Sequence, residues 1–134
     1  MKKDIPNLKV EDLAICIVPS ENKNDDLWDC YILNLQEEAI HNVLIVSRGY
    51  GDDAEGFRRQ TTTLRHFFDK IEPLNIETIE PIPKQLFNFT NEYWVSFTQN
   101  GHMFDKKYIF VVGSIEPINF TLIPFINRRG VMIR

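Results

Sequence analysis

The chain has 134 residues, of which 43% are hydrophobic and 25% charged, and its formal net charge is −4. This length suffices for one domain with its own core. The composition excludes an intrinsically disordered chain, which has fewer apolar residues and a higher net charge. The acidic excess also argues against a general nucleic-acid binder, because such a surface has to neutralise phosphates.

The residue types favour strands over helices. The chain contains ten Phe, two Trp and four Tyr, which are enriched in strands. Alanine, the best helix former, occurs only at positions 14, 39 and 54. We therefore expect an all-β fold, a single antiparallel two-layer β-sandwich of the immunoglobulin-like or a related type, with six to eight strands.

In chain order, we expect residues 1–9 to be a loose polar arm in front of a single domain over 10–134. Residues 13–18 are a continuous apolar run, which predicts a strand buried on both faces. Residues 27–35 are rich in strand formers, and a short polar link joins them to a similar run over 40–48. Two such runs so closely joined predict a hairpin.

The middle of the chain is less regular. Three glycines between 49 and 56 predict a surface loop. Over 61–71 the three threonines favour a strand, whereas Leu64, Phe67, Phe68 and Ile71 recur at helical spacing, so we expect a strand with one helical turn as the alternative at its end. Prolines exclude a long helix after it, and the alternation over 76–79 predicts a short edge strand.

The strongest local pattern surrounds Asn100-Gly101, between strand-like runs over 92–98 and 103–112. Asn-Gly supplies two positions with positive φ, which a two-residue type I′ hairpin turn requires. The resulting register pairs Phe97 with Phe104, Tyr93 with Tyr108 and Val95 with Lys106. The last pair makes one face only half apolar, which leaves a wider turn as the alternative. Residues 119–126, cut by Pro124, and 128–134 complete the strand pattern.

The opening of the chain and its cysteines predict a cytoplasmic protein. No apolar segment follows the lysines at positions 2 and 3, as a secretory signal requires, and no apolar run is long enough to span a membrane. Cys16 and Cys30 each lie in an apolar run, so we expect buried free thiols rather than a disulfide or metal ligands.

No motif for catalysis, a metal or a cofactor is present. The glycines at 49, 51 and 56 lack the lysine and spacing of a phosphate-binding loop. Asp52, Asp53 and Glu55 do not have calcium-loop spacing. Ser47, His66 and Asp69 form a triad only in principle, because no nucleophile turn surrounds the serine. We therefore predict no catalytic residue, no metal and no cofactor.

The best candidate for binding is a group of basic and aromatic residues on two neighbouring strands. If the strand over 40–48 pairs with the one beginning at Thr61, then Arg48, Tyr50, Arg65 and His66 converge, together with Arg58 and Arg59. Arginine recognises carboxylates and phosphates through two parallel hydrogen bonds. The alternative is that these are scattered surface charges paired with the acidic residues at 52, 53 and 55.

The sequence therefore predicts a non-enzymatic binding or protein-interaction module, with an unknown protein or peptide as partner. Self-association through a sheet edge is a variant, although Lys106 and Lys107 are typical of an edge protected against it. The alternative is an enzyme that handles a small molecule or nucleotide through the segment 49–59. We expect neither nucleic acid nor membrane as a partner.

The whole chain also resembles a group of small Bacteroidetes-type bacterial proteins of about this length. The resemblance rests on blocks at 1–5, 46–50, 61–66, 91–92, 105–108 and 127–131. Many members carry the label "phenylalanyl-tRNA synthetase subunit alpha". A synthetase core must hold ATP, an amino acid and the tRNA end on a much larger α/β scaffold. The resemblance therefore implies one bacterial cytoplasmic domain and carries over no functional residue.

Overall fold

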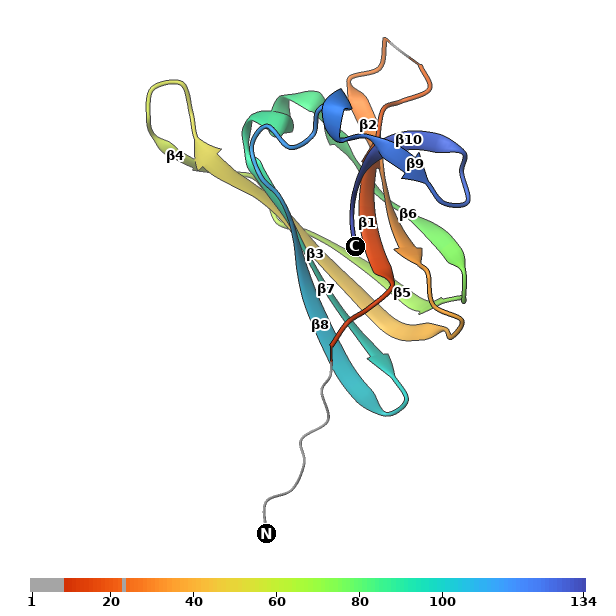
Figure 1. The fold of residues 1–134 in the computed structure, drawn as a ribbon. Coiled ribbons are helices and arrows are strands. Elements are labelled where there is room, and N and C mark those ends of the chain that lie inside the picture. The colour runs from red at the N-terminus through yellow and green to blue at the C-terminus, as the bar shows by residue number, and fades with distance from the viewer. Residues whose placement is uncertain (1–8, 23) are drawn as a thin grey trace.

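The computed structural model describes residues 9–22 and 24–134. Within them the chain forms ten strands and two short 3-10 helices, and no α-helix (Figure 1). The predicted all-β fold is confirmed, with two open antiparallel sheets of five strands each. Of the arm expected over 1–9, all but Lys9 lies outside the described residues. None of the described helices is long and apolar enough to cross a membrane.

Across the first sheet the strands lie in the order β6 (Asn75–Pro83), β2 (Leu27–Asn34), β1 (Leu13–Val18), β10 (Arg128–Ile133) and β9 (Thr121–Ile123). The hairpin predicted from the runs 27–35 and 40–48 is wrong, because the short link between them crosses from the first sheet to the second. In the second sheet, β3 (Ile40–Asp52) is the central element. Its partners on one side are β4 (Arg58–Gln60) and β5 (Leu64–Ile71), and on the other side are β7 (Thr90–Gln99) and then β8 (His102–Phe110). The 3-10 helices are η1 (Lys84–Asn88) and η2 (Pro117–Asn119).

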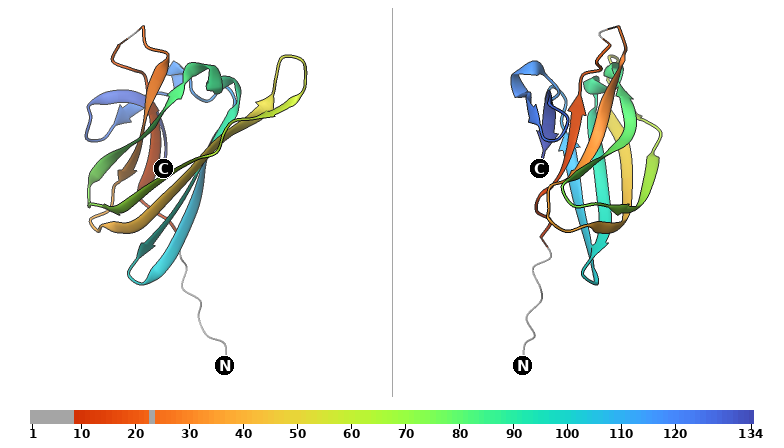
Figure 2. Two further views of the ribbon diagram at one scale, coloured as in Figure 1. Left: turned by 180° about the vertical axis from the view of Figure 1, so that it is seen from behind. Right: turned by 90° about the vertical axis from the view of Figure 1, so that its right-hand side faces the viewer.

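β1 is fully buried on both faces, as its continuous apolar run predicts. Leu13, Ile15 and Ile17 point into the core between the sheets. Cys16 and its neighbours on the other face belong to a second, smaller cluster with Ile123. The hairpin of β9 and β10 covers this second cluster and curls over that face of the first sheet (Figure 2).

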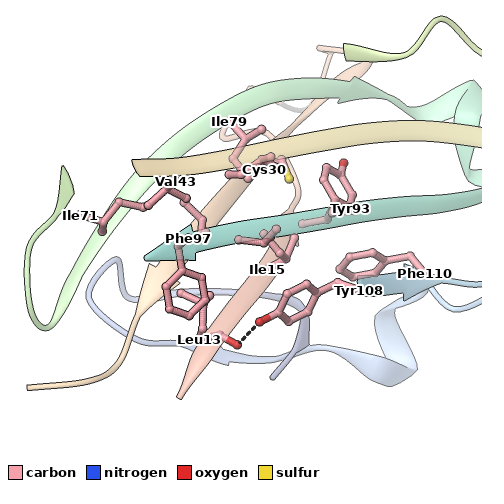
Figure 3. Close-up of a cluster of buried hydrophobic side chains, with 14 of the residues drawn as sticks. Leu13, Ile15, Cys30, Val43, Ile71, Ile79, Tyr93, Phe97, Tyr108 and Phe110 are labelled. Carbon is pink, nitrogen blue, oxygen red and sulfur yellow. Dashed lines mark hydrogen bonds between the residues drawn. The ribbon is translucent and has the colours of Figure 1, made fainter. Parts of the chain in front are cut away.

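The main core lies between the two sheets and contains large side chains from both (Figure 3). Tyr93 and Phe110 meet edge to face, with ring centroids 5.9 Å apart. The buried hydroxyl of Tyr108 on β8 donates a hydrogen bond of 2.6 Å to the carbonyl oxygen of Leu13 on β1. This bond joins the second sheet to the first through the middle of the core.

The Asn-Gly hairpin forms with the predicted register. Asn100 and Gly101 have φ of 52° and 76°, and Gln99 pairs with His102 across a two-residue turn. Phe97 and Phe104 are partners and stack with ring centroids 5.2 Å apart. The Val95–Lys106 pair, which suggested a wider turn, is compatible with the two-residue turn. Lys106 places its ammonium 5.1 Å from the Tyr108 ring centroid, so a cation–π contact accommodates its charge on this face.

The loop predicted over 49–56 is wrong in its first part. β3 continues through Gly49, Tyr50 and Gly51, and the turn to β4 covers only 53–57. These two glycines serve close packing rather than a bend. A Cβ on Gly49 would lie 3.0 Å from Asn91 Oδ1, and one on Gly51 would lie 3.0 Å from the Phe89 ring.

The strand count of six to eight is too low, since β4 and β9 add two strands of three residues each. Leu64–Ile71 is strand throughout, without the helical turn. Its apolar residues mimic helical spacing because Phe67 points outward and is 59% exposed. β6 is longer than expected and includes Pro81 and Pro83, which an edge strand tolerates.

Because of the two thiols, we expect the free energy of unfolding to depend on pH in the alkaline range. Burial raises the pKa of both Cys16 and Cys30 from 9.0 to about 12, so between these values the folded chain holds protons that the unfolded chain has released. We expect the free energy of unfolding to fall as pH rises from about 9 to 12, by about 1.4 kcal/mol per pH unit for each thiol.

Urea unfolding at a series of pH values measures this decline, with Cys16→Ala/Cys30→Ala as the control. The control retains the shallower decline from Tyr31, Tyr93 and Tyr108, whose pKa values burial also raises. Equal slopes for the two proteins would contradict the burial of the thiols.

Candidate functional site

The four residues singled out in the sequence lie on two opposite faces of the second sheet. Arg48 and Tyr50 occupy alternate positions of β3, and Arg65 pairs with Val46 of the same strand. Side chains of paired residues share a face, so these three all point to the outer face, away from the first sheet. His66 pairs with the fully buried Ile45 and therefore points inward. The structure brings together three of the four residues and separates His66.

Tyr50 lies between two arginines. The guanidinium carbon of Arg48, two residues earlier on β3, is 5.6 Å from the Tyr50 ring centroid, and that of Arg58 on β4 is 5.5 Å from it. Both distances fit a cation–π contact. The β3–β4 hairpin that carries Arg58 extends beyond the rest of the sandwich (Figure 1).

Glu92 anchors this face from β7, where it is the partner of Arg48. Its carboxylate is 3.0 Å from Arg48 Nε and 3.6 Å from Lys107 Nζ, and its side chain is only 7% exposed. A carboxylate so far removed from water needs this compensation. Glu92 therefore compensates the charges of Arg48 and Lys107, and these two side chains are not free to bind another anion.

Trp94 occupies the next outward position of β7 and forms an aromatic platform. It pairs with Val46, and its ring is 44% exposed. Lys107 Nζ lies 4.9 Å from the ring centroid, and the indole Nε1 donates a 3.2 Å hydrogen bond to Asp105. The ring is thus held in one orientation with much of its apolar surface in water.

Further apolar side chains extend this platform over the sheet. Phe67 pairs with Leu44, and Ile109 pairs with Glu92, which places all of them on the outer face. Phe67 is 59% exposed, and Leu44 and Ile109 are also exposed. No other helix or strand of the described residues covers this side of the second sheet (Figure 2).

Arg58 and Arg65 are the two cations of this face that remain available. Both are exposed, and neither has an ion-pair partner in residues 9–22 and 24–134. Arg59, by contrast, pairs with Asp53 at 2.8 Å. The expected pairing of the arginines with the acidic segment thus holds for Arg59 alone.

The acidic segment contains a turn that is closed by hydrogen bonds to Asp53. Asp53 accepts hydrogen bonds from the backbone N–H groups of Glu55 and Phe57, at 3.0 and 2.9 Å. The Arg59 guanidinium, followed by the Phe57 N–H, lowers the pKa of the Asp53 carboxyl. Its oxygens are occupied by protein donors, which explains the conformation of the turn without a bound cation.

Sequence reasoning missed two parts of the site. The sequence pattern places Trp94 in a strand-like run and Phe67 at helical spacing, and only the pairing of β3 with β5 and β7 puts both beside the arginines. The second part is a cavity of about 380 Å³ between the sheets, lined among others by Thr62, Leu64 and Ile82. Comparison with protein-family models, with curated proteins and with solved structures finds no match.

The ion pair between Arg48 and Glu92 predicts that the fold tolerates a charge reversal at Arg58 better than one at Arg48. Arg48→Glu would set a second carboxylate against buried Glu92, so we expect the free energy of unfolding to fall by about 1–3 kcal/mol. Arg58→Glu on the same face should change it by less than about 0.5 kcal/mol. Urea unfolding compares the two variants, and equal losses would contradict the anchoring role of Glu92.

Proposed function

We propose that this protein is a non-enzymatic binding module that holds an acidic, apolar segment of another protein on the outer face of the second sheet. One observation carries the proposal. Phe67 and Trp94 are exposed on the same sheet face as Arg58 and Arg65, which have no ion-pair partner among the described residues.

An exposed apolar group of this kind is costly in water and typical of interaction surfaces. Aromatic residues and arginine are also the types that dominate the binding energy of protein interfaces. Glu92 and Asp105 fix Arg48, Lys107 and Trp94 in place. The face is thus ordered before binding, which reduces the entropy lost when a partner arrives.

The charge pattern favours an acidic peptide over a nucleic acid. Asp52, Glu92 and Asp105 lie on the same outer face as the cations, and the chain has a net charge of −4. These carboxylates disfavour a phosphodiester backbone, which carries a charge at every nucleotide, whereas a peptide needs acidic side chains only at Arg58 and Arg65.

The alternative, an enzyme that uses segment 49–59, has no comparable support. Residues up to Asp52 belong to β3, β4 begins at Arg58, and the short turn between them is closed on Asp53. A cytoplasmic location remains part of the proposal, supported by Cys16 and Cys30 as free thiols.

Self-association through a sheet edge remains a second form of the proposal. β8 lies at one edge of the second sheet and pairs only with β7 among the described strands. Light scattering at high concentration tests this form directly. A monomer at every concentration would exclude it without affecting the peptide site.

Selection from a random peptide library on the immobilised protein tests the proposed function. We expect the selected peptides to be enriched in Asp or Glu next to large apolar residues, and to bind more weakly as salt rises. Arg58→Glu/Arg65→Glu should weaken binding at least about tenfold, and Phe67→Ser should weaken it as well.

The matched control is Lys9→Glu/Arg129→Glu, which makes the same change of charge at exposed positions outside this face. Binding should be unchanged in the control, and all variants should unfold at nearly the same temperature. Peptides without acidic enrichment, or equal loss in both double variants, would refute the proposal. Arginine-dependent binding of an oligonucleotide instead of peptides would also refute it.

A further inference from the structure

The free edge of β5 lies beside the proposed peptide surface. β5 pairs with β3 on one side, and no strand in the described part of the chain pairs with its other side. Most of its residues are exposed. An edge strand presents a row of unpaired N–H and C=O groups, to which a second extended chain can bind as an added strand.

The hydrogen bonds of β3 show which backbone groups of β5 are free. The Gly49 carbonyl accepts a bond from Thr61 N–H at 2.8 Å, and the Gly49 N–H donates to the Thr61 hydroxyl at 2.6 Å, so the backbone of Gly49 faces this side of β3. In an antiparallel ladder, residues that bond to a given neighbour strand alternate with residues that do not. The register of β3 with β7 is regular over 44–50, so Ser47 and Ile45 also direct their backbone groups to the side of β5.

Arg65 and Phe67 therefore point their backbone N–H and C=O groups to the free edge. Leu64 and His66 are the partners of Ser47 and Ile45 and use their own backbone groups toward β3, which leaves the residues between and after them for the opposite side. Arg65 and Phe67 also carry an available cation and an exposed ring of the peptide surface. Free backbone groups and recognising side chains thus come from the same two residues.

The other edges of the two sheets are poor acceptors of an added strand. β4 and β9 have three residues each. β6 contains Pro81 and Pro83, which lack the N–H that a ladder requires. Lys106 of β8 pairs with buried Val95 and so places a charge on the inner face, which is one of the devices that protect edges from pairing. Residues 64–68 of β5 include neither proline nor lysine.

The inner side of the β5 edge is open as well. Leu64 points toward the first sheet but is 39% exposed, and it lines the cavity of about 380 Å³ together with Pro81 and Ile82 of β6. β5 and β6 are joined by residues 72–74 and belong to different sheets, so they border this space without pairing. An inward-pointing side chain of an added strand would lie beside Leu64, where apolar contacts are available.

We propose that the acidic, apolar segment binds as an extended strand added to the free edge of β5, which rests on the proposed function and specifies how that partner is held. Side chains of a strand alternate between its two faces. An acidic side chain opposite Arg65 and a large apolar one opposite Phe67 are therefore two positions apart in either strand direction. A helical segment would instead present such side chains three or four positions apart.

Hydrogen exchange of the ¹⁵N-labelled protein, alone and with a peptide from the library selection, tests the inference. We expect the amides of Arg65 and Phe67 to exchange at least about tenfold more slowly with the peptide bound, because they become donors to it. The amides of Leu64 and His66 already bond to β3 and should change less. The amides of β8 are the control for a general effect on edge strands and should not change.

Peptides with a single N-methyl group provide a second measurement, with the unmodified peptide as the control. An added strand donates to β5 from every second residue only. N-methylation should therefore weaken binding at least about tenfold at alternate positions and change it little at the positions between them.

Three results would overturn strand addition and leave the proposed function intact. They are binding without slower exchange at Arg65 and Phe67, equal effects of N-methylation at all positions, and selected peptides whose acidic and apolar residues are three or four positions apart. Failure to select any acidic, apolar peptide would overturn both proposals.

Discussion

The structure depends above all on which way the side chains of β3 point. Val43 and Ile45 are fully buried between the sheets, and this burial fixes the register of β3 against β5 and β7. Because successive side chains of a strand point to opposite faces, Leu44, Arg48 and Tyr50 must then lie outside. A slip of one residue would exchange the two sets, at the cost of the core.

The site on the outer face follows from this alternation. The outer positions of β3, β5 and β7 gather the aromatic platform and its arginines, while Leu64 and His66 point to the inner side of the sheet. The first sheet lies on that inner side, where the bulge of β6 places Glu80 3.9 Å from His66. The peptide surface therefore needs one sheet, and the cavity needs the sandwich.

Local patterns predicted the elements that depend on local physics. The Asn100-Gly101 turn and the doubly buried run over 13–18 were correct because backbone conformation and apolar continuity decide them. Gly49 and Gly51 were misread because their reason is the approach of Asn91 and Phe89, which are distant in sequence. His66 is a different case, because residues 65 and 66 are consecutive in a strand and point to opposite faces in any register. The pairing with β3 decides only that Arg65 is the one that points outward.

Cross-strand nuclear Overhauser effects of the backbone protons of β3 test the alternation most directly. The structure predicts contacts of Val46 with Arg65 on one side and with Trp94 on the other. Contacts of Val46 with His66 and Tyr93 instead would show a register shifted by one residue. Such a shift would turn His66 outward and Arg65 inward, and would contradict the assignment of the outer face.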